Sequence, residues 1–154
     1  MIEPVVLWAA VLLPALAALS WIDMRTLRLP DVITLPLIIT GMAQWWYFFG
    51  DANDAAIGAM VGYLFFVGVE VAYRRIRGRD GLGRGDAKLL AAGGAWCGWA
   101  DLPLIVLVAS GAACVFVLAY WGVRRRPIGL FPFGPFLALG IASVWLMVTL
   151  TDWL

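Results

Sequence analysis

The stretch LLAAGGAWCGWA at residues 89–100 decides the topology of this chain. It is shorter than the roughly 20 apolar residues that a membrane-crossing helix needs, so by length alone it is typical of a buried or re-entrant segment. Five other apolar stretches are each about long enough to cross a hydrocarbon core of roughly 30 Å: residues 4–22, 32–49, 55–73, 103–122 and 133–150. Whether residues 89–100 also cross therefore determines the side of the membrane on which the later loops lie.

The composition and the placement of charge both indicate an integral membrane protein. Of the 154 residues, 64% are hydrophobic and only 14% are charged. Every Lys and Arg falls in one of three clusters: Arg25 and Arg28; Arg74, Arg75, Arg77, Arg79, Arg84 and Lys88; and Arg124, Arg125 and Arg126. The other loops and the two termini carry only acids: Glu3, Asp51, Asp54, Asp101 and Asp152. Since basic residues gather on the cytoplasmic side of membrane proteins, the three clusters mark the cytoplasmic loops.

The same charge rule predicts that residues 89–100 cross the membrane. The second and third basic clusters can share one side only if an even number of crossings separates them, and residues 103–122 supply one. The short helix can span if it extends back through Asp86 and Lys88, which places Asp86 at the membrane edge. We therefore expect a single all-α transmembrane domain over residues 1–154, with six helices and both termini outside.

Two groups of small or aromatic residues have structural interpretations. Gly58 and Gly62, and likewise Gly94 and Gly98, have the spacing that lets helix backbones approach closely, so we expect helix-packing seams there. Aromatic residues cluster near the predicted outer boundary, where amphipathic rings prefer to lie: Trp45, Trp46, Tyr47, Trp96, Trp99 and Trp153.

No metal or cofactor site is predicted, and neither is a disulfide. The chain has two cysteines, Cys97 and Cys114, and no histidine, so nothing supplies the remaining ligands of a metal site. Their expected depths differ by roughly 12 Å at 1.5 Å per residue, more than a disulfide allows between its Cα atoms. We interpret both as small packing residues.

The longest cytoplasmic segment, residues 74–85, combines five arginines with four glycines. This composition predicts a mobile loop apposed to the membrane, with anionic lipid headgroups as its partners. A nucleic-acid partner is not predicted, because the chain offers no base-reading fold and no aromatic stacking platform.

Four acids share one expected membrane depth, at the cytoplasmic ends of the helices: Asp23, Asp31, Glu70 and Asp86. Carboxylates at the edge of the hydrocarbon are costly, which makes each of them a functional candidate. Two carboxylates that share one proton can activate water for attack on a peptide carbonyl, with one acting as base and the other as acid.

Three of these acids also have ordinary structural interpretations. Asp31 directly precedes an apolar run and suits a helix cap. Glu70 lies four residues before Arg74, which favours an ion pair along one helix face. Asp23 has Arg25 nearby and fits an ordinary interfacial acid. The spacing by itself leaves these alternatives open.

Asp86 is harder to explain structurally. Gly83 and Gly85 precede it in a Gly-x-Gly-Asp run, and glycines allow backbone shapes that are closed to other residues. Such a loop can bring a substrate backbone close to the carboxylate.

Four segments, taken in order, carry a resemblance over almost the whole chain: Asp23 followed by LPDVITLP at 29–36, DGLGRGDAKLL at 80–90, GAW at 94–96 and PFGP at 132–135. With these segments the sequence resembles the prepilin leader peptidase family of type IV pilus and type II secretion systems. Members of that family are polytopic aspartic peptidases of the Gly-x-Gly-Asp type.

The resemblance implies a catalytic pair formed by Asp23 and Asp86, with Gly83 and Gly85 as loop glycines. Lys88 matches a motif lysine to which charge alone assigns no role. The implied reaction is cleavage of a prepilin or pseudopilin leader at the cytoplasmic face of the bacterial inner membrane, without a cofactor. The implied substrate has a glycine before the cut and an apolar helix after it.

The resemblance does not extend to methyl transfer. Larger members carry an added region with two Cys-x-x-Cys pairs, with which N-methyltransferase activity is associated, and this sequence does not contain that region. The alternative from another class is a non-enzymatic membrane component, either transporter-like or an assembly scaffold, in which the acids serve as ion sites or packing contacts. The sequence indicates no oligomeric state.

Overall fold

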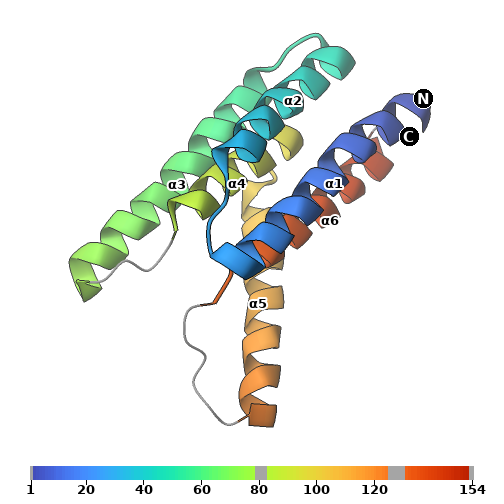
Figure 1. The fold of residues 1–154 in the computed structure, drawn as a ribbon. Coiled ribbons are helices and arrows are strands. Elements are labelled where there is room, and N and C mark those ends of the chain that lie inside the picture. The colour runs from blue at the N-terminus through green and yellow to red at the C-terminus, as the bar shows by residue number, and fades with distance from the viewer. Residues whose placement is uncertain (1, 79–82, 125–130, 153–154) are drawn as a thin grey trace.

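The structure is a computed structural model that describes residues 2–78, 83–124 and 131–152, and these residues form six α-helices (Figure 1). In chain order they are α1 (Ile2–Thr26), α2 (Asp31–Phe49), α3 (Asn53–Arg77), α4 (Arg84–Cys97), α5 (Leu102–Arg124) and α6 (Gly134–Asp152). Five of them, all except α4, are long and apolar enough to cross a membrane. The expected fold class, an all-α polytopic membrane protein, is confirmed.

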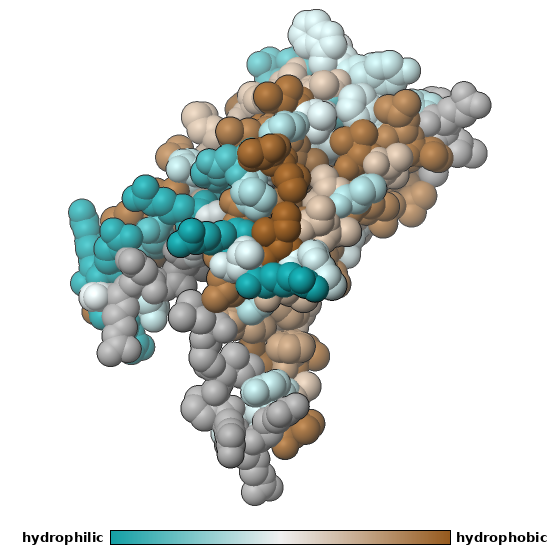
Figure 2. Space-filling model, in the orientation of Figure 1, coloured by the Kyte–Doolittle hydropathy of each residue, from teal (hydrophilic) through white to brown (hydrophobic). Residues whose placement is uncertain are grey.

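Figure 1 shows α1, α2, α3 and α6 lying roughly along one direction, whereas α5 runs away from them at a steep angle. The start of α1 and the end of α6 lie together at one end of the bundle, as Figure 1 shows. At the opposite end of α1 lie the connection to α2 and the first residues of α4 and α6. The most hydrophilic side chains in Figure 2 gather near that connection and the end of α3. We call this end the α1–α2 end.

The short helix α4 lies in the middle of the bundle and packs against α2, α3, α5 and α6. Every residue from Leu89 to Cys97 is buried. The helix begins at Arg84, so the expected extension back through Asp86 and Lys88 is confirmed, although it ends at Cys97. Its 14 residues span about 21 Å at 1.5 Å per residue, less than a hydrocarbon core. The sixth crossing therefore remains a prediction.

Glycines hold α4 against α3, as the spacing predicted. A Cβ atom added at Gly58 would collide with the backbone of Gly94, and one added at Gly94 would collide with the backbone of Gly58. One turn further along α3, a Cβ atom at Gly62 would lie 2.8 Å from the carbonyl oxygen of Leu90. Because the two backbones touch, small residues at these positions fix the depth at which α4 lies.

Trp96 corrects the interpretation of the aromatic cluster. Trp46, Tyr47 and Trp99 are exposed, whereas Trp96 is fully buried in the core. Its indole Nε1 donates a hydrogen bond to the carbonyl oxygen of Leu37 at 2.7 Å. A buried indole with its N–H satisfied is a packing element, and the boundary interpretation of Trp96 is wrong. Trp153 lies outside the described residues.

The two cysteines are free, in agreement with the prediction of no disulfide. Cys97 is buried at the end of α4, and the interpretation as a packing residue holds there. Cys114 is exposed on α5, so the same interpretation is wrong for it.

The predicted loop at residues 74–85 is largely helical where it is described. Residues 74–77 continue α3, and residues 84–85 already belong to α4. Arginine is a good helix former, and α3 ends only at Gly78, whose φ of 66° closes the helix through a hydrogen bond from its N–H to Arg74 O. The expectation of a loop is wrong for these residues, and residues 79–82 lie outside the described part.

Candidate active site

Asp23 lies in the last turn of α1, and its side chain is almost completely buried, with 5% exposed. It is buried because α6 begins beside it, and the backbone N–H of Gly134 donates a hydrogen bond to Asp23 Oδ2 at 2.9 Å. Arg25 does not pair with Asp23 but lies over the ring of Trp21, 4.3 Å from its centroid. The interpretation of Asp23 as an ordinary interfacial acid is therefore wrong.

Asp86 lies in the first turn of α4, where helix geometry holds it firmly. Gly83 is the N-cap residue, with extended backbone angles, and the N–H of Asp86 donates to Gly83 O at 3.0 Å. A carboxylate in the first turn of a helix also lies at the positive end of the helix dipole. The side chain is thus carried on a regular helix.

The two motif glycines act differently from the expectation. Neither Gly83 nor Gly85 has a positive φ, so the backbone shapes reserved for glycine are not used here. Gly85 instead allows close packing, since a Cβ atom there would lie 3.0 Å from the Cβ of Leu29. The start of α4 can therefore touch the connection between α1 and α2.

All five site residues expected from the sequence line one cavity of about 280 Å³ at the α1–α2 end. Its lining comprises Asp23, Leu27, Arg28, Leu29, Gly83, Arg84, Gly85, Asp86 and Lys88. The carboxylates of Asp23 and Asp86 are near enough to interact electrostatically. A water molecule takes about 30 Å³ in the liquid, so several water molecules fit beside the two carboxylates. We call this space the dyad cavity.

Asp31 does not cap α2, contrary to the sequence interpretation. The N-cap residue of α2 is Pro30, and no side-chain capping bond is formed. Lys88 Nζ instead donates to Asp31 Oδ1 at 2.5 Å. The ammonium group on α4 attracts the carboxylate across the interface, which ties the start of α2 to the start of α4.

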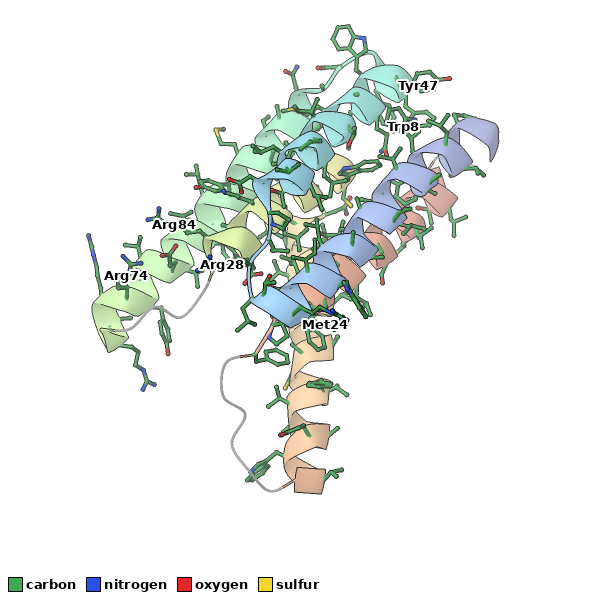
Figure 3. All side chains as sticks on the ribbon, viewed as in Figure 1. Trp8, Met24, Arg28, Tyr47, Arg74 and Arg84 are labelled. Carbon is green, nitrogen blue, oxygen red and sulfur yellow. The ribbon has the colours of Figure 1, made fainter. Side chains whose placement is uncertain are left out.

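Glu70 forms the predicted ion pair along α3, with 2.8 Å between its Oε1 and Arg74 Nη2. Its other oxygen, Oε2, lies 3.9 Å from Arg84 Nε at the start of α4. Figure 3 shows Arg74 and Arg84 near the end of α3 and the start of α4. Glu70 is buried between two arginines and does not line the dyad cavity.

The four acids that were predicted to share one membrane depth therefore separate into two kinds. Asp31 pairs with Lys88 and so joins α2 to α4, whereas Glu70 pairs with Arg74 inside α3 and lies 3.9 Å from Arg84 of α4. Asp23 and Asp86 share a cavity and have no basic partner within salt-bridge distance among the described residues. Within those residues, no group of three or more acidic or thiol side chains is placed to hold a metal ion.

The sequence did not predict that Gly134 contributes to this site. The PFGP motif marked the start of α6, but nothing in its spacing connects it to an aspartate 111 residues earlier. A glycine between proline residues at a helix start was the available signal, because it indicates a close approach of backbone to another group.

The chain is similar in sequence to known proteins. A sequence model of the type IV leader peptidase family matches residues 10–119. The chain is 48% identical over 131 residues to a prepilin leader peptidase/N-methyltransferase of Burkholderia pseudomallei, covering 84% of this chain and 42% of that protein. It is 46% identical over 125 residues to the protein of the same description from Escherichia coli K12, covering 79% and 55%.

The chain is also 40% identical over 134 residues to a prepilin leader peptidase/N-methyltransferase of Pseudomonas aeruginosa, covering 84% of this chain and 46% of that protein. The chain thus spans about half the length of the curated relatives it matches. No solved structure gave a significant match. On the strength of the family match and these identities, the chain belongs to the type IV leader peptidase family.

Proposed function

We propose that this protein is an aspartic endopeptidase that removes the leader peptides of type IV prepilins or pseudopilins. One observation carries the proposal: Asp23 on α1 and Asp86 on α4 line a single cavity that has room for several water molecules, while Asp31 and Glu70 have basic partners. Membership of the type IV leader peptidase family supports the choice of reaction.

The reaction follows from two carboxylates that hold one proton between them. Adjacent carboxylates repel when both are charged, which favours one ionised and one protonated group. The ionised carboxylate takes a proton from a water molecule while the oxygen of that water attacks the scissile carbonyl carbon. The protonated carboxylate gives its proton to the nitrogen of the leaving amine. The carbon–nitrogen bond breaks, and the pair again holds one proton.

The position of the dyad cavity suits a substrate that is itself a membrane protein. The cavity lies at the ends of helices that are long enough to span the bilayer. An apolar helix of the substrate would lie in the bilayer against the bundle, with its leader in the water. We assign the α1–α2 end to the cytoplasmic face of the bacterial inner membrane, because the basic residues gather there. The six helices then act as one peptidase domain over residues 1–154.

The test is co-expression with a prepilin, followed by a gel shift of the substrate. The wild-type chain should shorten the prepilin, and the double variant Asp23→Asn, Asp86→Asn should leave it at full length while accumulating in the membrane at the same level. Cleavage by the double variant would refute the assignment. A non-enzymatic assembly component would leave the substrate uncut with either chain.

A further inference from the structure

We propose that Gly134 is a positioning residue for the dyad: its backbone N–H and its missing side chain together hold the Asp23 carboxylate in place. This inference rests on the proposed peptidase function. Gly134 opens α6, and its N–H donates to Asp23 Oδ2 at 2.9 Å within the buried part of the bundle.

In the first turn of α6, one backbone N–H group has no partner inside the helix and can donate to Asp23. The first N–H groups of a helix have no partner within that helix. Pro135 has no N–H, and the N–H groups of Phe136 and Leu137 both donate to Phe133 O at 3.1 Å. Gly134 therefore carries the remaining donor of this turn, and Asp23 accepts from it. A side chain of α1 thus caps α6, and the cap is a carboxylate of the dyad cavity.

The contact requires glycine because of space and not because of backbone shape. A Cβ atom at position 134 would lie 2.6 Å from Asp23 Oδ2 and 2.9 Å from Asp23 Cγ. Gly134 has no positive φ, so alanine would meet no backbone strain there. The helices α1 and α6 pack together (Figure 1), which limits their freedom to move apart. Any side chain at this position must displace the carboxylate.

This arrangement fixes one carboxylate oxygen and leaves the other free. Oδ2 is held by Gly134, so Oδ1 is the oxygen that remains available to a water molecule. No such donor reaches the Asp86 carboxylate from the described residues. Catalytic groups need their geometry held by such surrounding contacts, and an error of about 1 Å can cost about 10²-fold in rate.

The first experiment compares Gly134→Ala with Gly68→Ala. Gly68 is a helical glycine at which a Cβ atom would meet nothing within 4 Å. On a purified prepilin, Gly134→Ala should lose about 10²-fold in kcat with KM unchanged, since the carboxylate moves while the substrate surface remains. Gly68→Ala should match the wild type. Equal kcat for the two variants would overturn the inference.

The second experiment does not depend on the folding of Gly134→Ala. The sequence contains two Phe-Gly pairs, Phe49-Gly50 and Phe133-Gly134. Labelling Phe with ¹³C at the carbonyl carbon and Gly with ¹⁵N therefore selects two amide signals by NMR, and Gly50 serves as the internal reference. The Gly134 signal should move in Asp23→Ala and stay in Asp86→Ala. A Gly134 signal that ignores Asp23→Ala, or responds equally to both variants, would refute the contact.

The outcomes also separate this inference from the proposed function. If the Asp23→Asn, Asp86→Asn double variant still cleaves prepilin, the peptidase assignment fails. If that variant is inactive while Gly134→Ala cleaves like Gly68→Ala, only the positioning role fails.

Discussion

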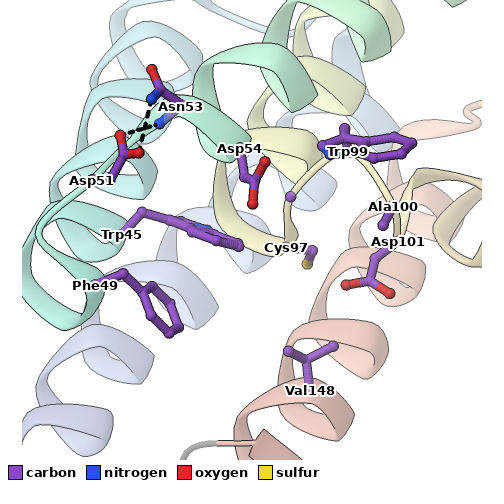
Figure 4. Close-up of a pocket in the computed structure, with 11 residues that line it drawn as sticks. Trp45, Phe49, Asp51, Asn53, Asp54, Cys97, Trp99, Ala100, Asp101 and Val148 are labelled. Atoms are coloured by element: carbon purple, nitrogen blue, oxygen red, sulfur yellow. Dashed lines mark hydrogen bonds between the residues drawn. The ribbon is translucent and has the colours of Figure 1, made fainter.

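The two ends of the bundle both carry a cavity lined by acids, yet the two cavities differ in size and in the burial of their acids. At the end opposite the dyad, Asp51, Asp54 and Asp101 line a cavity of about 500 Å³ together with Cys97 and Trp99 (Figure 4). At the α1–α2 end the dyad cavity is smaller, about 280 Å³, and contains two acids.

Burial and placement distinguish these ends more than the number of acids does. Asp51 and Asp54 are exposed, and both carboxylate oxygens of Asp51 accept hydrogen bonds from Asn53, at 2.9 and 2.8 Å. Asp23 is buried and interacts electrostatically with Asp86 from another helix. Neighbouring carboxylates in a poorly solvated site can share one proton, and this is the basis of the peptidase mechanism proposed above.

The largest expected effect separates the two cavities directly. Asp23→Asn or Asp86→Asn should each reduce prepilin cleavage by about 10²–10⁴-fold, because a proton-transfer group is lost. Asp54→Asn, the matched change in the other cavity, should leave cleavage unchanged. Cleavage assays at equal protein levels measure this. A comparable loss of cleavage in Asp54→Asn would show that the effect is not specific to the acids of the dyad cavity.

A smaller effect is expected from Glu70→Gln, which removes a buried charge outside the dyad cavity. The variant loses the attraction between two opposite charges, while its amide oxygen can still accept a hydrogen bond from Arg74, so we expect a loss of about 1 kcal/mol of unfolding free energy. Its Tm in detergent should fall, while cleavage should fall less than in the aspartate variants. Asp54→Asn serves again as the exposed control. An unchanged Tm would mean that the pair between Glu70 and Arg74 contributes nothing measurable to stability.

Asp31→Asn should have a weaker effect still. Asp31 is half exposed in its ion pair with Lys88, and such pairs contribute about 0–1 kcal/mol. Added salt should weaken the wild-type pair, so the Tm difference between variant and wild type should shrink as salt rises. Asp31→Glu, which keeps the charge, is the control. A loss of cleavage as large as that of Asp86→Asn would place Asp31 in the catalytic machinery.

The smallest change is expected at the opposite end of the bundle. Asp51→Ala removes the acceptor for Asn53 at an exposed position, where substitutions usually change stability by about 0.5 kcal/mol or less. Cleavage should be indistinguishable from the wild type in the same assay. A clear loss of cleavage would mean that this end communicates with the dyad cavity.

The sequence by itself determined the helices and the local contacts. Long apolar stretches and segregated basic clusters predicted the helix positions, because a membrane requires a minimum helix length and sorts charge by side. The Glu70–Arg74 ion pair was predictable too, since residues four apart on a helix face one another. The glycine seam between Gly58 and Gly94 followed from spacing in the same way.

Only the tertiary structure decided which distant groups meet. Asp31 fitted a helix cap until α4 brought Lys88 to it across 57 residues, and the Gly134 N–H reached Asp23 across 111. Trp96 fitted the membrane boundary until the surrounding helices buried it. Periodicity and charge order describe one helix and its depth, whereas the rotation and packing of each helix against its neighbours depend on contacts between segments far apart in the chain. For that reason the sequence predicted one membrane depth for four acids, and only the packing of the helices brought two of them, Asp23 and Asp86, to one cavity.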